Sequence, residues 1–162
     1  MHLNIVGLNP PLKNIFLIGF NHETASLSLR ERLAFDSDQL LKSYIDLKDN
    51  VGLHEALILS TCNRTEIYVF GENCEQLLDW ISARKGIPID NLNSHVYTRS
   101  GIDVVIHAAS VASGMDSMVL GETQIFGQMK VAYRQSDASN CLGRISLRVL
   151  NSSNSANALG FR

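Results

Sequence analysis

Apolar and polar positions along the chain first predict a buried strand followed by helix. Residues 14–20 (NIFLIGF) form an apolar run of strand length that ends at a polar turn. Residues 27–33 and 38–47 then carry apolar side chains at helical intervals, with Asp36 or Ser37 as the N-cap between them. The pattern therefore predicts one helix, or two short helices, after the first strand.

Two further strands are predicted on either side of a short polar connection. Residues 56–60 (ALILS) and 66–70 (EIYVF) have the composition of strands, and residues 61–65 (TCNRT) separate them. A connection of this length predicts a hairpin or a short loop, with Cys62 in it.

A helix and a last strand complete the predicted sheet unit. Over residues 72–85 the apolar side chains fall on one helical face, and Gly86 stands where a helix commonly ends in the left-handed conformation. Residues 95–98 give a weaker strand signal. The order β-α-β-β-α-β over residues 14–98 predicts an α+β fold of the ferredoxin-like class.

C-terminal helices are predicted after this unit. Residues 102–112 and 122–135 show helical periodicity, and we expect these helices to cover the sheet or line a site. The tail from residue 151 is rich in Ser and Asn, which favour caps and turns, so we expect it to fray. We assign residues 1–13 to an extension and residues 14–150 to one domain.

Composition favours a protein of a reducing compartment. The 162 residues are 45% hydrophobic and 19% charged, which suits one globular domain. The net charge is -2, so no overall positive field attracts nucleic acid. The three cysteines lack the spacing of a disulfide framework, and neither a targeting pattern nor a membrane-spanning run is evident. We expect a cytoplasmic protein that has no membrane partner.

Cys62 is the best candidate for a nucleophile. A cysteine reacts as a thiolate, which forms where the thiol is accessible and near positive charge. Cys62 lies in a polar loop two residues before Arg64, whereas Cys74 and Cys141 have apolar surroundings typical of packing residues. From the residues alone, a small buried hydrophobe at a strand end remains the alternative for Cys62.

His107, Gln124 and Gln128 are the other candidates. On the helix over residues 102–112, His107 is predicted to lie opposite the core stripe, which consists of Ile102, Val105, Ile106 and Ala109. A hydrogen-bonded structural histidine is the alternative. Gln124 and Gln128 are four residues apart, so a helix puts both amides on one face, where they could bind a polar ligand or face solvent.

Neither a metal site nor a dinucleotide site is predicted. The histidines and cysteines match none of the usual zinc spacings. The sequence also contains no G-x-G-x-x-G and no Walker A pattern. We therefore expect these 162 residues to carry no dinucleotide site of their own.

Three segments of the chain resemble the N-terminal domain of glutamyl-tRNA reductases. They are residues 19–35 (GFNHETASLSLRERLAF), 59–69 (LSTCNRTEIYV) and 112–130 (ASGMDSMVLGETQIFGQMK). Their order and separation also match, and the similarity extends from Ile15 to about Arg134.

The resemblance implies a reaction. Members of this family reduce glutamyl-tRNA with NADPH to glutamate-1-semialdehyde, the first committed step of tetrapyrrole synthesis by the five-carbon route. The family cysteine corresponds to Cys62, whose thiolate would attack the aminoacyl ester, release tRNA and form a thioester that accepts hydride. Besides glutamyl-tRNA, the implied partners are glutamate-1-semialdehyde aminomutase and a second copy in a homodimer.

The resemblance also implies the composition of the glutamate pocket. One wall would consist of Thr61, Cys62, Asn63 and Arg64. The other would consist of Ser117, Glu122, Thr123, Gln124 and Gln128. Arg64 would pair with a substrate carboxylate, because a planar guanidinium suits bidentate recognition. His107 matches a functionally important histidine of the family and would orient the substrate or assist proton movement.

Departures from the family pattern leave alternatives open. Ser26 and Thr123 stand where many members have proline, which would loosen two loops of the pocket. The family continues into an NADPH-binding domain and a dimerisation domain, and we expect both to be absent from these residues. The chain alone would then lose its thioester to water and act as a glutamyl-tRNA esterase. A non-catalytic RNA-binding module and a regulatory copy of the reductase are the remaining alternatives.

Overall fold

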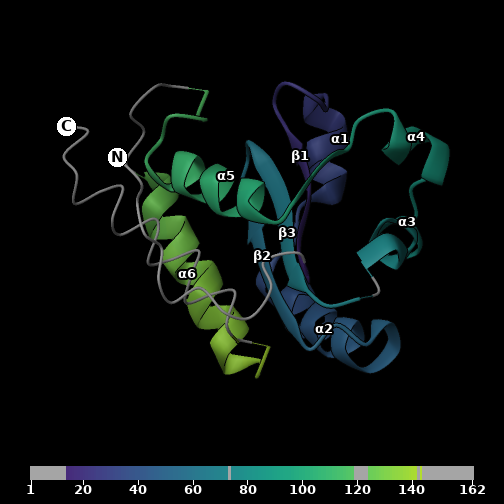
Figure 1. Ribbon diagram of the computed structural model, residues 1–162. Coiled ribbons are helices and arrows are strands. Elements are labelled where there is room, and N and C mark those ends of the chain that lie inside the picture. Colours follow the sequence, from purple (N-terminus) through teal and green to yellow (C-terminus); the bar gives the residue numbers. More distant parts are fainter. Residues whose placement is uncertain (1–13, 73, 119–123, 142, 144–162) are drawn as a thin grey trace.

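Figure 1 shows a sheet with helices on both sides, in a computed structural model that describes residues 14–72, 74–118, 124–141 and 143. Four antiparallel strands form the sheet in the order β2-β3-β1-β4. Their bounds are β1 Ile15–Asn21, β2 Glu55–Ser60, β3 Arg64–Phe70 and β4 Tyr97–Ser100. With helices between β1 and β2 and between β3 and β4, this arrangement confirms the predicted ferredoxin-like fold.

Four helices lie on one side of the sheet. α1 (Leu27–Leu33) and α2 (Ser37–Asp46) follow β1, and α2 runs on into the π-helical turn Leu47–Val51. α3 (Leu77–Lys85) and α4 (Ile89–Asn93) lie between β3 and β4. The sequence predicted the first two helices and α3, whereas α4 was not anticipated.

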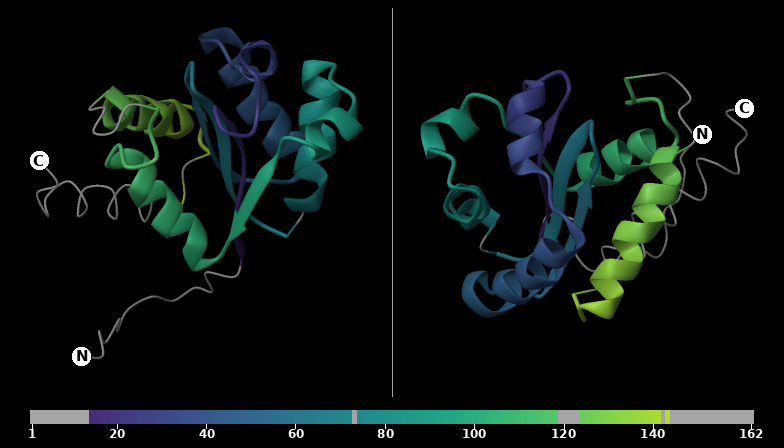
Figure 2. Two further views of the ribbon diagram at one scale, coloured as in Figure 1. Left: turned by 90° about the horizontal axis from the view of Figure 1, so that it is seen from above. Right: turned by 180° about the vertical axis from the view of Figure 1, so that it is seen from behind.

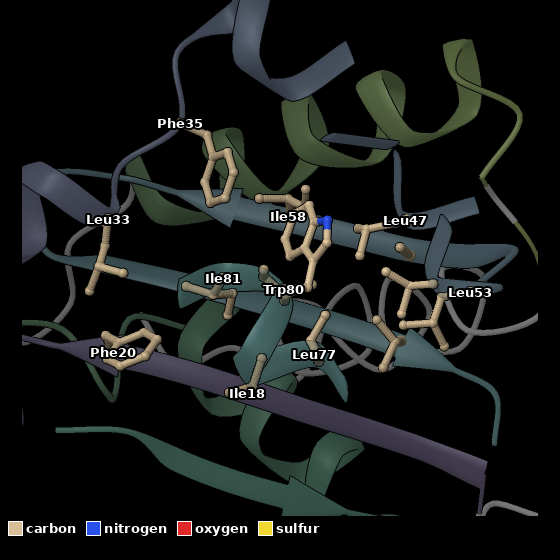
Figure 3. Packing of buried hydrophobic residues seen from close by; sticks show 14 of the residues in the cluster. Ile18, Phe20, Leu33, Phe35, Leu47, Leu53, Ile58, Leu77, Trp80 and Ile81 are labelled. Atoms are coloured by element: carbon tan, nitrogen blue, oxygen red, sulfur yellow. The ribbon is translucent and has the colours of Figure 1, made fainter. Parts of the chain in front are cut away.

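The main hydrophobic core lies between this layer and the sheet (Figure 3). Side chains from the strands interlock with side chains from the helices, among them Ile18, Phe20, Ile58, Leu77 and Trp80. Removing a side chain of this size from water contributes about 1.5–3 kcal/mol to folding. This core therefore holds α1, α2 and α3 against the sheet.

Two helices, α5 (Ile102–Ala112) and α6 (Gln124–Ala138), cover the opposite face of the sheet, as both views of Figure 2 show. A second cluster of buried residues lies there, including Leu17, Leu57 and Met129. Alternate residues of a strand point to opposite faces, and here both faces are covered. This explains why the strands read as continuous apolar runs in the sequence.

Side-chain caps fix the two helices that follow β1. The carboxylate of Asp36 accepts a hydrogen bond from the backbone N–H of Gln39 at 2.8 Å, so Asp36 rather than Ser37 is the N-cap of α2. The hydroxyl of Ser26 accepts from the N–H of Leu29 at 3.3 Å. Ser26 is therefore the N-cap of α1.

β3 begins earlier than predicted. Arg64 and Thr65 belong to the strand, because Asn21 and Phe20 at the end of β1 pair with them and extend the ladder. The connection from β2 is therefore a tight turn over residues 61–63. As a result, the position of Arg64 in the strand determines the face of the sheet toward which its side chain points.

α3 and β4 both begin later than predicted. A 3-10 turn over Cys74–Gln76 precedes α3, so the α-helix starts at Leu77. β4 starts at Tyr97, because the backbone N–H groups before it donate to the carbonyl of Leu92 and prolong the turn after α4. The predicted tail and the first residues of the 122–135 helix lie outside the described residues.

The core stripe predicted for α5 is wrong. Ile102 and Ile106 are 48% and 60% exposed, whereas the buried residues of α5 are Val104, Ala108, Val111 and Ala112. Apolar residues lie on nearly every side of α5, so the periodicity of the sequence alone did not identify its buried side. His107 lies on the side toward the sheet, where it finds a hydrogen-bond partner in Glu66.

Candidate functional site

The turn between β2 and β3 presents Cys62 to solvent. The hydroxyl of Thr61 accepts hydrogen bonds from the backbone N–H groups of Asn63 and Arg64, at 3.2 and 3.1 Å. The N–H of Thr61 donates to the carbonyl of Arg64 at 2.8 Å and closes the turn. Cys62 is exposed, so the alternative of a small buried hydrophobe is wrong. Cys141 is buried and Cys74 packs at the edge of the main core, as expected.

Arg30 joins this turn to α1. Its Nε donates to the carbonyl of Cys62 at 3.3 Å, and its Nη1 donates to the carbonyl of Ala25 at 2.7 Å. A cavity of about 290 Å³ lies on this side of Cys62. Its described lining is Leu27, Arg30, Glu31, Ala34, Phe35, Ser60, Thr61 and Cys62. Sequence analysis missed Arg30, because 32 residues separate it from Cys62.

A second, smaller cavity brings the predicted site residues together. It measures about 30 Å³, and its described lining is Thr61, Cys62, Asn63, Arg64, Ser117, Gln124, Ile125 and Gln128. All of these except Ile125 belong to the predicted pocket. Gln124 and Gln128 lie on one face of α6, as their spacing predicted. Glu122 and Thr123 lie outside the described residues.

A larger groove of about 570 Å³ adjoins this cavity between α2 and α6. Its described lining is Phe35, Asp36, Ser37, Leu40, Ile58, Ser60, Gln124, Gly127, Gln128, Val131, Ala132 and Gln135. The groove and the small cavity share Gln124 and Gln128. Gly127 leaves room in it, since a Cβ at this position would meet no atom within 4 Å.

Arg64 is buried and engaged by two acidic residues. Its side chain is 2% exposed, and its Nη1 lies 2.9 Å from both Glu66 Oε1 and Asp116 Oδ2. Its Nη2 donates to the backbone carbonyl of Asp116. The sequence suggested a substrate carboxylate as the partner of Arg64, but acidic residues of the chain itself hold the guanidinium here.

Glu66 is the centre of a buried polar cluster. Residues two apart on a strand share a face, so Arg64, Glu66 and Tyr68 all point toward α5. Glu66 Oε1 accepts from Arg64 at 2.9 Å, from Tyr97 at 2.6 Å and from His107 Nε2 at 2.7 Å. Its Oε2 accepts from Tyr68 at 2.5 Å. Every partner of this carboxylate is therefore a donor.

The cluster keeps Glu66 ionised. Burial by itself would raise the pKa of this carboxyl, but the hydrogen bond and charge of His107, the charge of Arg64 and the hydrogen bond from Tyr68 lower the pKa to about 2. Burial and the charge of Glu66 raise the pKa of Tyr68 and of Tyr97, so both phenols remain donors.

Gly19 makes room for this cluster in the middle of the sheet. Gly19 pairs with Glu66 of β3 on one side and with Tyr97 of β4 on the other. The Tyr97 ring crosses over Gly19, and a Cβ there would lie 2.5–2.7 Å from its outer atoms. A glycine in a strand interior often marks such a close approach. Sequence analysis missed Gly19, Glu66 and Tyr97, although this glycine inside an apolar strand was a usable signal.

His107 is connected to the pocket residue Arg64 through Glu66. Its side chain is 11% exposed, and its ring packs against Tyr97 at 5.7 Å between centroids. His107 is absent from the described lining of the cavities beside Cys62. Its connection to the pocket runs from Glu66 to Arg64, so His107 is one ion pair removed from the residues around the thiol.

Metal ligands and parallel neighbouring strands are both missing from the described residues. Among them, no group of three or more His, Cys, Asp or Glu side chains could hold a metal ion. All pairings between neighbouring described strands are antiparallel, whereas dinucleotide-binding folds are built on a mostly parallel sheet. No helix in the described part of the chain is long and apolar enough to cross a membrane.

Fold and site together define a ferredoxin-like α+β domain with an exposed cysteine at a polar pocket. The family model described as "Glutamyl-tRNAGlu reductase, N-terminal domain" matches residues 18–158, and the chain belongs to this family.

Relatives and a solved structure agree with this assignment. The chain is 40% identical over 131 residues to the glutamyl-tRNA reductase of Pseudoalteromonas translucida, a match that covers 80% of the chain and 31% of the relative. The match to the enzyme of Aromatoleum aromaticum is also 40% over 131 residues and covers 81% and 31%. The structure of glutamyl-tRNA reductase from Methanopyrus kandleri superimposes with a TM-score of 0.73 at 25% identity, covering 90% of this chain and 34% of that one. The chain thus spans about a third of its relatives' length.

Proposed function

We propose that Cys62 accepts the glutamyl group of glutamyl-tRNA as a thioester. The thiolate attacks the ester carbonyl carbon, a C–S bond forms, and the C–O bond to the terminal ribose breaks. The ribose oxygen leaves and takes up a proton. The observation that carries this proposal is the exposure of Cys62 on a closed turn, beside the polar side chains of the small cavity.

The remaining pocket residues bind and orient the acyl group. Thr61, Asn63, Ser117, Gln124 and Gln128 provide hydrogen-bonding groups around the thiol. Glu122 and Thr123 join them on the strength of the family resemblance. Arg64 receives the free carboxylate of the glutamyl side chain. His107 is a positioning residue, because its contact with Glu66 helps to hold Arg64 in place.

The large groove suits the nucleoside at the end of the tRNA. The ribose that carries the ester must lie next to Cys62 during the attack, and the groove shares two glutamines with the Cys62 cavity. Its described lining offers amides, hydroxyls and the Asp36 carboxylate but no Lys or Arg. This chemistry favours ribose hydroxyls and a neutral base over a phosphate group.

The reduction step belongs to the larger relatives. When bound, NADPH would supply the hydride that converts the thioester to glutamate-1-semialdehyde for tetrapyrrole synthesis. The sequence lacks the glycine-rich phosphate-binding pattern of dinucleotide sites, and neighbouring strands of the described sheet are antiparallel. We therefore assign to these 162 residues the acyl-transfer half of the reaction.

Intact-mass analysis after mixing the chain with glutamyl-tRNA tests the proposal. We expect the wild type and Cys74→Ser to gain the mass of one glutamyl group, and Cys62→Ser to gain nothing. Cys74→Ser is the matched control, because Cys74 is a second thiol that is not buried but packs against the core. An adduct that persists in Cys62→Ser would contradict the proposal, as would wild-type protein that leaves the ester intact.

A further inference from the structure

The two acidic partners of Arg64 differ in how firmly they are held. Glu66 is fully buried, and the side chains of Arg64, His107, Tyr68 and Tyr97 all donate to it. The side chain of Asp116 is 34% exposed, and the ion pair with Arg64 links it across 52 residues of sequence. Asp116 can therefore move into water at far lower cost than Glu66.

Repulsion between like charges disfavours a third carboxylate at Arg64 while Asp116 stays in place. Two carboxylates, those of Glu66 and Asp116, already lie 2.9 Å from the same Arg64 nitrogen. A substrate carboxylate arriving at Arg64 would face two like charges. If the Asp116 carboxylate leaves, an incoming carboxylate restores the original arrangement.

The contacts of Arg64 lead to the same conclusion. The cavity lined by Cys62 and Arg64 measures about 30 Å³, much smaller than the 290 Å³ cavity on the α1 side of Cys62. A substrate carboxylate that pairs with Nη1 of Arg64 would compete there with the Asp116 carboxylate, which already lies 2.9 Å away.

We propose that Asp116 is a placeholder for the substrate carboxylate. In the free protein it keeps the buried guanidinium of Arg64 paired, and on binding the side-chain carboxylate of the acyl group displaces it. The identification of that carboxylate rests on the proposed acyl transfer to Cys62. The exchange replaces one charge-assisted bond with another, so a carboxylate displaces Asp116 more readily than a neutral amide does.

Asp116→Asn tests this exchange, with Asp103→Asn as the matched control. Asp103 is an exposed acid on α5, so its substitution removes the same charge and leaves Arg64 untouched. We expect Asp116→Asn to lower the melting temperature and yet to bind glutarate roughly three- to fivefold more tightly in calorimetry, as expected for a partly exposed ion pair. In the same variant, acylation of Cys62 by a glutamyl α-thioester should reach half its maximal rate at a correspondingly lower thioester concentration, and the maximal rate should not change. For the glutaminyl thioester, the decrease in the half-saturating concentration should be smaller.

The outcomes separate this inference from the proposed function. If Asp116→Asn binds glutarate no better than the wild type, or slows both thioesters equally, Asp116 is structural and the inference is wrong. If glutarate binding improves but no adduct forms with any donor, the placeholder role stands and acyl transfer to Cys62 fails.

Discussion

At the scale of single residues, the site depends most on Glu66, whose carboxylate has only donors around it. In Glu66→Gln the amide nitrogen would point a donor at other donors, and Arg64 would keep only Asp116 as a charged partner. Removing one member of a buried ion pair costs about 3–5 kcal/mol. We expect urea denaturation at neutral pH to show a loss of this size, whereas Glu72→Gln, an exposed acid just after β3, should stay near the wild type.

The same variant should show a characteristic pH dependence. The folded-state pKa of Glu66 is about 2, below its ordinary value of 4.5, so the folded protein binds this proton less readily than the unfolded chain. The stabilisation by Glu66 is therefore complete above pH 4.5 and disappears as the pH falls toward 2. The difference in free energy of unfolding between wild type and Glu66→Gln should shrink over this window. A difference that stays constant down to pH 2 would show that the Glu66 carboxylate is not held ionised.

At the scale of elements, the sequence predicted those parts of the fold that depend on local pattern. α1 and α5 have the predicted bounds, and the end of α3 at Gly86 follows from its left-handed conformation. The local sequence could not predict the start of β3, because it is the pairing with the distant end of β1 that adds Arg64 to the strand. Once that start is known, the alternation of side chains along a strand places Arg64 and Glu66 on the same face of the sheet.

The site itself could be predicted only in part, for reasons of distance and of ambiguous pattern. The residues of the β2–β3 turn were predicted largely from the family resemblance and the glutamines of α6 also from their spacing, and the structure places both groups around one cavity. The pairing of Arg64 with Asp116 spans 52 residues, and no periodicity reports such a contact. The buried side of α5 could not be chosen because apolar residues surround it, so His107 was assigned to the wrong side.

α6 gives a way to test the groove without touching the thiol pocket. Gly127→Leu puts a side chain into open space within the groove, and it also favours the helix because glycine is a poor helix former. We expect acylation of Cys62 by glutamyl-tRNA to fall about tenfold or more, since the groove would be too narrow for the terminal nucleoside. Acylation by a small glutamyl α-thioester should be unchanged.

A matched control for Gly127→Leu is Asp137→Leu, an exposed position near the end of α6 outside the groove lining. This variant should use both donors like the wild type. Equal losses with both donors in Gly127→Leu would mean that the groove supports the thiol pocket rather than the nucleoside.

At the scale of the whole molecule, both faces of the sheet are already covered by helices, and the thiol pocket lies at one end of the sheet between them. The chain matches 31% of the length of its relatives, and its sequence contains no dinucleotide pattern. Under the proposed acyl transfer, we infer that a glutamyl thioester formed on Cys62 would react with water in a solution of these 162 residues.

We accordingly expect the chain, given glutamyl-tRNA, to release free glutamate slowly through the Cys62 thioester, with NADPH present or absent. Chromatography of the products and the absorbance of NADPH measure this directly, and Cys62→Ser gives the background rate of ester hydrolysis. Consumption of NADPH together with formation of glutamate-1-semialdehyde would overturn the assignment of acyl transfer alone. A hydride site would then have to exist within these residues, despite the antiparallel pairing of all the described strands.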